Sequence, residues 1–359
     1  MRSLVVKLVT VVICTLFAVA IAAGSADAAA PIVIKLAHFS TADMVFPGQG
    51  LSPNAIVMKN YIEQASGGEM KVEIYPNAEL GSVRPMIELT QTNAVQMTIP
   101  YTSIMVPFLP EMAVTQIPFL FKDNVIALRV MNGPFGQELN ELWIKKTGTR
   151  VLSWPEGSGF RQVYTKNKLV KTPDDLKGLK IRVPENPGLL ALFSAYGAKT
   201  VTVTWTELYT ALQTGVADAC ETELSSADET KLFEVMRYTT MLNHCYNNQP
   251  VLINEAFFQS LSSKNKMILM RAAELGFITH NGFNRAAENA VIEKQMKAGV
   301  KFYTPNEAEM KQWKEIGQKA YLEQLQKSVS PDFIKKAFDA VAKAEAGLEQ
   351  ENRAKAGIK

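Results

Sequence analysis

The chain has 359 residues, of which 47% are hydrophobic and 20% are charged, and its formal net charge at pH 7 is +3. This balance is typical of a globular protein and excludes a disordered chain, a collagen and a disulfide-dense mini-domain. A chain of this length has room for about two domains, because single cores tend to split at this size.

The first 28 residues have the pattern of a secretory signal peptide. Arg2 and Lys7 form a positively charged start, residues 8–23 are almost purely apolar, and residues 26–28 (Ala-Asp-Ala) form a small-x-small cleavage site. A membrane anchor is the alternative, but the apolar run is short and no stop-transfer pattern follows it. A lipoprotein anchor is disfavoured because Ile13, not a small residue, precedes Cys14. The signal predicts a periplasmic protein.

Removal of residues 1–28 leaves 331 residues with a net charge of +2, because the segment contains two basic residues and one acidic residue. A charge this small gives no argument for a nucleic acid or an anionic membrane surface as a partner, and neither is expected. No second apolar run approaches membrane-spanning length. Cys220 and Cys245 remain in an oxidising compartment, so either one disulfide or two free buried thiols are consistent with the sequence; general cysteine burial favours the thiols.

Strands and helices alternate through the first part of the chain. Apolar or alternating segments at 31–37, 70–75 and 95–99 predict strands. Helices are expected at 53–66, ending at Gly67-Gly68, and at about 83–93, capped by Ser82. This order is typical of βαβ units with a mostly parallel sheet.

A second α/β unit follows, with Gly and Pro at most of its boundaries. Strands are predicted at 150–154, 180–183, 199–204 and from 216 to 219, a capped helical turn at 172–178, and helices at 187–196 and 205–214. The two units in tandem agree with the expectation of two domains.

Ser262 or Ser263 can cap a helix that meets no Pro and only Gly276 and Gly282 before Gly299. About 36 uninterrupted residues would extend roughly 54 Å, enough to lie across both lobes. The alternative is two helices broken near Gly282. After Pro305 the chain is helix-rich to its end. The predicted first lobe consists of residues 31–153 plus about 239–282. The second lobe is about 154–238 plus about 283–359, including the C-terminal helices.

Standard catalytic and cofactor motifs are missing from the sequence. It contains no Gly-rich phosphate loop, no HExxH, no CxxC and no GxSxG elbow, and its three histidines have no metal-ligand spacing. The lone Gly157-Ser158-Gly159 is interpreted as a turn. Glu221 and Glu223 are open to two interpretations, an acid–base pair or a solvated strand edge. The sequence therefore predicts neither a metal nor a cofactor, and no enzyme.

Two arginines favour the binding of an anion. Arg161 follows the Gly-rich segment, and Arg182 lies inside the apolar strand at 180–183. Ligands of α/β sheets bind at strand ends, and a guanidinium grips a carboxylate through two charge-assisted hydrogen bonds. Such a pair contributes roughly 3–6 kcal/mol, on the order of 10² to 10⁴ in affinity. The alternative for Arg182 is an edge strand facing water.

Aromatic side chains at strand and helix junctions can form the walls of such a site. Most such residues belong to the core, but Phe39 and Tyr101 follow strands at the expected carboxyl edge of the first lobe. The complete set is Phe39, Tyr101, Trp154, Trp205 and Tyr246.

Four segments in order resemble the extracytoplasmic solute-binding proteins of tripartite ATP-independent periplasmic (TRAP) transporters, of the DctP type. They are residues 77–81 (NAELG) with Arg84, 117–123 (IPFLFKD), 172–184 (TPDDLKGLKIRVP) and 207–218 (ELYTALQTGVAD). The resemblance covers the whole mature chain. It implies a two-lobe α/β fold with mixed or parallel sheets, a hinge, and a long helix across both lobes.

The resemblance also implies roles for individual residues. The arginine before Pro184, Arg182, would hold the ligand carboxylate, Arg161 would add a second donor or charge, and Trp205 would stack on the ligand. First-lobe contacts would come from Phe39, Ser40, Ser82 and Tyr101.

The chain departs from the family after Asp218. Relatives commonly have Gly-Gln-Glu-Asn-Pro where this chain has Ala219-Cys-Glu-Thr-Glu223, so Thr222 replaces an asparagine that often contacts the ligand. The position of Tyr101 can be polar or acidic in relatives. The carboxylate anchor is therefore kept while the ligand's identity stays open.

The expected function is capture of a small organic acid between the lobes and its delivery to a permease with a small and a large membrane subunit. In this family an ion gradient drives transport, so no ATP site is expected. One alternative is a binding protein that signals to a sensor receptor. Another is a periplasmic enzyme that uses Glu221 and Glu223. Dimers occur in the family, so a homodimer is left open.

Overall fold

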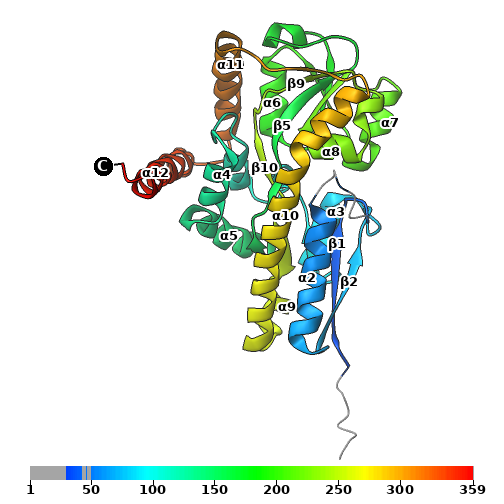
Figure 1. Ribbon diagram of the computed structural model, residues 1–359, viewed down its shortest axis with the longest axis vertical. Coiled ribbons are helices and arrows are strands. Elements are labelled where there is room, and N and C mark those ends of the chain that lie inside the picture. Colours follow the sequence, from blue (N-terminus) through cyan, green and yellow to red (C-terminus); the bar gives the residue numbers. More distant parts are fainter. Residues whose placement is uncertain (1–29, 43–45, 47–49, 359) are drawn as a thin grey trace, which may run out of the picture.

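The computed structural model describes residues 30–42, 46 and 50–358, and the predicted signal peptide at 1–28 lies outside the described residues. Two sheets, one above the other in Figure 1, form two lobes, and one long helix runs beside both. Across the described part of the chain, no helix combines the length and apolar character that a membrane crossing requires. The predicted two-lobe α/β fold with a long helix is confirmed.

The first sheet has the order β2-β1-β3-β11-β4. Its strands β1 (Ile32–His38), β2 (Met70–Tyr75) and β3 (Met97–Ile99) are parallel, as the alternation with α2 (Leu51–Ser66) and α3 (Val83–Gln91) predicts. β11 (Val251–Asn254) is antiparallel to β3 and to β4 (Thr149–Ser153). The sheet is therefore mixed, because β11, which begins more than 90 residues after the end of β4, lies between β3 and β4.

The second sheet has the order β12-β9-β5-β8-β6-β7, and β10 pairs with β5. β6 (Lys180–Val183) and β7 (Lys199–Thr202) agree with the sequence-based expectation, whereas the strand expected at 216–219 is β8 (Ala219–Glu223). The sequence analysis missed four strands of this sheet, β5 (Glu156–Thr165), β9 (Tyr238–Thr240), β10 (Tyr246–Asn248) and β12 (Lys301–Tyr303), as well as β11 of the first sheet.

The interpretation of Gly157-Ser158-Gly159 as a turn is wrong, because these residues belong to β5. Glycine is required at 157 for packing: a Cβ there would lie 2.7 Å from the carbonyl oxygen of Asn247 in β10. Gly159 has φ of +85°, in the left-handed region that favours glycine. These glycines let β10 approach β5 closely, and Arg161 consequently lies within a strand.

The helical elements predicted for the second unit are present. They are the capped turn η3 (Pro173–Leu176), α6 (Pro187–Ala195), and η4 (Trp205–Glu207) with α7 (Leu208–Gln213); α8 (Leu224–Glu229) was not predicted. The remaining short elements are η1 (Thr102–Ile104), η2 (Pro110–Gln116), η5 (Leu232–Glu234) and α9 (Glu255–Ser260).

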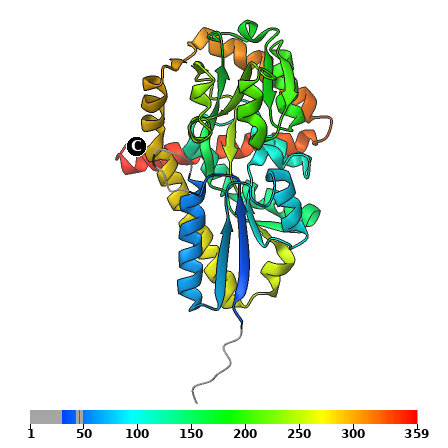
Figure 2. The ribbon, with the colours of Figure 1, turned by 90° about the vertical axis from the view of Figure 1, so that its right-hand side faces the viewer.

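The long helix α10 (Ser263–Lys297) has 35 residues without a break, so the alternative of two helices is wrong. It begins where the Ser262 hydroxyl accepts a hydrogen bond from the Asn265 amide at 3.1 Å. It packs against α2 in the first lobe and α8 in the second, and Figure 2 shows it from the side.

We expect the two glycines of α10 to respond oppositely to alanine. A Cβ at Gly276 would lie 2.1 Å from Asn54 Oδ1 of α2, whereas nothing lies within 4 Å of one at Gly282. Gly276→Ala should therefore destabilise the protein by about 1–3 kcal/mol, and Gly282→Ala should stabilise it by up to about 1 kcal/mol. Urea unfolding of both variants checks this; equal effects would contradict it.

The C-terminal helices divide between the lobes. α11 (Glu307–Leu325) packs on α6 of the second lobe. α12 (Pro331–Lys355) instead packs on α4 (Asn124–Met131) and α5 (Pro134–Thr147), which belong to the predicted first lobe, and projects to the side in Figure 1. The prediction that all C-terminal helices join the second lobe is thus wrong for α12. Its apolar face, with Phe333 buried against Phe135, covers α5 rather than a second-lobe helix.

Candidate functional site

Two adjoining cavities lie between the lobes. The space within them is about 260 Å³ for the first and about 510 Å³ for the second, and both volumes include open solvent. Both are lined by Tyr101, Arg182, Pro184 and Trp205. These shared residues make the two cavities parts of one cleft.

The structure brings most of the predicted site residues together. Six line the first cavity, namely Phe39, Tyr101, Arg161, Arg182, Trp205 and Thr222. Ser82 lines only the second cavity, where it precedes α3. Ser40 lines neither cavity, because its hydroxyl donates to the Glu229 carboxylate across the cleft.

Arg182 is buried in the middle of the second sheet. β6 lies between β7 and β8, and the residue is only 1% exposed, so the alternative of an edge arginine facing water is wrong. Its Nε donates to the Val203 carbonyl oxygen at 2.9 Å. Within residues 30–42, 46 and 50–358, no carboxylate oxygen lies within 4 Å of its guanidinium. A buried cation without a directly paired carboxylate is costly, so this one is suited to receive an anion.

Arg161 has the opposite environment, because two carboxylates already surround it. Its Nη2 donates to Glu221 Oε1 at 2.8 Å and its Nη1 to Glu223 Oε1 at 2.9 Å, while its Nε contacts the other Glu221 oxygen. Glu221 is fully buried and Glu223 is 3% exposed, so the interpretation of these two as a solvated edge is wrong. The antiparallel pairing of β5 with β8 places Arg161 directly opposite Glu223.

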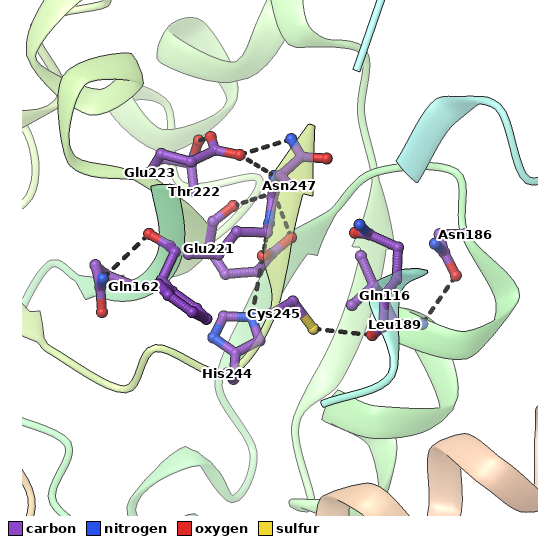
Figure 3. A network of polar contacts seen from close by, with 12 residues as sticks. Gln116, Gln162, Asn186, Leu189, Glu221, Thr222, Glu223, His244, Cys245 and Asn247 are labelled. Atoms are coloured by element: carbon purple, nitrogen blue, oxygen red, sulfur yellow. Dashed lines mark hydrogen bonds and ion pairs between the residues drawn. The ribbon is translucent and has the colours of Figure 1, made fainter. Parts of the chain in front are cut away.

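The electrostatics of Glu221 follow from this pairing. Burial by itself would raise the pKa of this carboxyl, but the Arg161 charge and hydrogen bonds from His244 and Arg161 lower its pKa to about 2. His244 Nε2 lies 3.2 Å from Glu221 Oε2; Figure 3 labels both residues. Glu221 is therefore a permanent counter-charge and does not line either cavity.

Asn247 of β10 completes the polar wall of the first cavity. Its Nδ2 donates to Glu223 Oε1 at 2.6 Å, and the Thr222 hydroxyl donates to Glu223 Oε2 at 2.9 Å, as Figure 3 shows. The sequence analysis missed Asn247 because β10 itself was missed. The only local signal is a polar run at 247–249 between Tyr246 and Pro250.

Aromatic rings form the opposite wall. Phe39 and Tyr101, at the ends of the parallel strands β1 and β3, meet edge to face with centroids 5.4 Å apart. Trp205 of the second lobe meets Phe39 at 6.2 Å, so rings from both lobes touch. Burial raises the pKa of Tyr101, although the Arg182 charge opposes this, so its hydroxyl remains a hydrogen-bond donor. Trp154 and Tyr246 are core residues outside both cavities.

Polar contacts also join the lobes across the cleft. The Thr41 amide donates to Glu229 Oε1 at 2.6 Å, beside the Ser40 contact. Arg84 of α3 donates to Glu185, which follows β6, at 2.7 Å. The lobes therefore meet around the cavities in this structure.

The site contains no arrangement for a metal or a redox centre. No group of three or more potential metal-ligating side chains occurs in the described ranges. Cys220 and Cys245 are free and buried, so of the two alternatives the free thiols are confirmed. Burial raises the pKa of Cys220 to about 12, which keeps it an unreactive thiol.

Two lobes joined by crossing strands, with an anion-receptive cleft between them, define a two-lobe solute-binding protein. The sequence profile of bacterial extracellular solute-binding protein family 7, DctP, matches residues 49–328. A solute-binding protein of Verminephrobacter eiseniae is 34% identical over 251 residues, which cover 70% of this chain and 73% of the relative.

Solved structures agree with this match. The sugar acid binding protein of Advenella mimigardefordensis in complex with galactonate has a TM-score of 0.82 at 26% identity, and covers 88% of this chain and 99% of that one. A TRAP periplasmic solute-binding protein of Shewanella oneidensis with bound succinate has a TM-score of 0.80 at 28% identity, covering 87% and 100%. The chain belongs to the DctP family of TRAP-type solute-binding proteins, as its motifs predict.

Proposed function

We propose that this protein captures a small organic carboxylate in the interlobe cleft, with Arg182 as the anchor. The observation that carries this proposal is the buried Arg182 guanidinium, which borders both cavities and has no carboxylate within 4 Å among the described residues. A ligand carboxylate would supply the missing counter-charge through two hydrogen bonds. The relatives from Advenella and Shewanella, with galactonate and succinate bound, support a carboxylate as the ligand class.

The other predicted residues take different parts in this proposal. Tyr101, Phe39 and Trp205 would enclose the ligand, with the Tyr101 hydroxyl donating to it, and Thr222 would orient Glu223. Arg161 borders the first cavity, but Glu221 and Glu223 take four of its five N–H donors, so we assign it mainly to holding these carboxylates. Ser82 would contact only a ligand that extends into the second cavity, and Ser40 would bridge the lobes through Glu229.

We infer that the protein does not catalyse a reaction. Glu221 and Glu223, the acid–base candidates, are ion-paired with Arg161, and the pKa of Glu221 is too low for a general acid. The bound acid should return chemically unchanged after long incubation; a new product would contradict this inference.

We also propose that the signal peptide at 1–28 exports the chain to the periplasm. There it would deliver its ligand to a permease with a small and a large membrane subunit. Membership of a TRAP-type family supports this partner over a sensor receptor. A homodimer is a further candidate, and the mass of the exported protein in solution would test it.

A thermal-shift screen tests the proposed function. The exported chain is heated with small monocarboxylates, dicarboxylates, keto acids, sugar acids and aromatic acids, and with neutral sugars and amines. A ligand at 100 times its Kd should stabilise the protein by about 2.7 kcal/mol, a shift of several degrees. Hits confined to acids are expected. Hits confined to neutral sugars or amines would show that Arg182 has another role.

A further inference from the structure

Glu223 is a carboxylate that faces the proposed ligand. It lines the first cavity together with Arg182, at the end of β8, and is only 3% exposed. Arg161 and Asn247 both donate to its Oε1, at 2.9 and 2.6 Å, which fixes the orientation of the group. The cleft therefore has a buried acceptor within the same small cavity as its cationic anchor.

The hydrogen-bond capacity of Glu223 is not fully used. An ionised carboxylate has about four acceptor positions, two on each oxygen. Oε1 accepts two hydrogen bonds, whereas the Thr222 hydroxyl at 2.9 Å is the single donor recorded for Oε2 among the described residues. Oε2 thus has one acceptor position without a donor among the described residues, on a side chain that lines the first cavity.

The charges around the cavity favour the same kind of ligand. Arg161 and Arg182 carry two positive charges, and Glu221 and Glu223 carry two negative ones, so these four buried groups sum to zero; His244 contacts Glu221 but does not line the cavity. A ligand with an ammonium and a carboxylate preserves this sum, whereas a dicarboxylate adds two negative charges. Buried excess charge is costly, and like charges in one small cavity repel each other.

We propose that Glu223 selects carboxylate ligands that carry a hydrogen-bond donor, an ammonium or a hydroxyl group, within a few atoms of the carboxylate, and disfavours a second carboxylate there. This inference rests on the proposed function, because Arg182 must first hold a carboxylate. The charge balance ranks an amino acid above a hydroxy acid, and a hydroxy acid above a dicarboxylate. The apolar side chains Val83, Pro85 and Ile104 in the second cavity suit a short aliphatic tail.

Matched ligand series measured by calorimetry test this ranking. The four-carbon series is butanoate, 2-hydroxybutanoate, 2-aminobutanoate, 4-aminobutanoate and succinate. A six-carbon series of hexanoate, its 2-hydroxy and 2-amino forms, and adipate extends the tail. In the wild-type protein, the best donor-bearing acid should bind at least tenfold more tightly than its unsubstituted and dicarboxylate counterparts, as expected for one charge-assisted hydrogen bond.

Glu223→Gln removes the charge with little change of shape, and should reduce this preference to less than threefold. Glu221→Gln is the matched control, because it removes the same charge from the same arginine without touching the cavity. It should lower stability and weaken the discrimination against the dicarboxylate, but keep the preference for the hydroxy acid over its unsubstituted counterpart, which Glu223→Gln removes. The inference is overturned if the dicarboxylate binds as tightly as the donor-bearing acid, or if Glu223→Gln leaves the preference unchanged. Failure of every acid to bind would instead refute the proposed function itself.

Discussion

Arg182→Ala is expected to weaken binding of the carboxylate ligand by roughly 10²- to 10⁴-fold, the value of a bidentate, charge-assisted pair. The loss should be large because the other described arginine bordering the first cavity, Arg161, already uses four of its five N–H donors on Glu221 and Glu223. Titration calorimetry of wild type and variant with the best acid of the thermal-shift screen measures the effect.

The stability of the ligand-free protein should change little in this variant. The Arg182 side chain donates to the Val203 carbonyl oxygen and has no ion pair with a described carboxylate, so its removal loses little direct interaction. A change of about 1 kcal/mol is expected in urea unfolding. Arg182→Lys keeps the charge but loses the planar fork, and should also bind more weakly than wild type. Wild-type affinity in either variant would show that the anchor is another residue.

Arg161→Ala should have the reverse profile, with a large loss of stability. The substitution leaves Glu221 and Glu223, which are 0% and 3% exposed, without their counter-charge. Breaking a buried ion pair from one side costs about 3–5 kcal/mol. Arg129→Ala is a suitable control, because the Arg129–Glu351 pair lies at the surface and is worth about 1 kcal/mol or less. Urea unfolding of both variants distinguishes them; equal losses would contradict the assignment.

The effect of Arg161→Ala should depend on pH. The pKa of the Glu221 carboxyl is about 2 in the folded protein, against 4.5 for a glutamate side chain without these interactions. Its ion pair with Arg161 therefore stabilises the folded state fully above about pH 4.5. This contribution is lost as the pH falls from about 4.5 towards 2, where the carboxyl protonates. The difference between wild type and variant should therefore be largest near neutral pH and shrink in acid. A difference independent of pH would show that the loss is one of packing.

Arg161 and Arg182 are similar residues in one cleft, but their ion-pairing partners differ. Both are buried, both border the first cavity, and both lie in strands of the second sheet. Their surroundings differ: Arg161 has two carboxylates and Arg182 has none within 4 Å among the described residues. The first arginine thus holds Glu223 in place, and the second is the one that we propose as the ligand anchor.

The sequence by itself determined the features that depend on local chemistry. Strands β1, β2, β6 and β7 and helices α2 and α6 follow from short-range apolar patterns and from Gly and Pro at their ends. The cap at Ser262 and the lack of proline predict α10, and the motif around Arg182 identified the family.

Only the tertiary structure decided which residues surround that anchor. Arg161 meets Glu221 and Glu223 because β5 pairs antiparallel with β8, about 60 residues away, and Asn247 reaches Glu223 because β10 pairs with β5. Such pairings depend on the burial of whole sheets, and no local pattern in the chain encodes them. The same reason explains why the glycines of β5 resembled a turn and why Ser40 contacts Glu229 instead of lining a cavity.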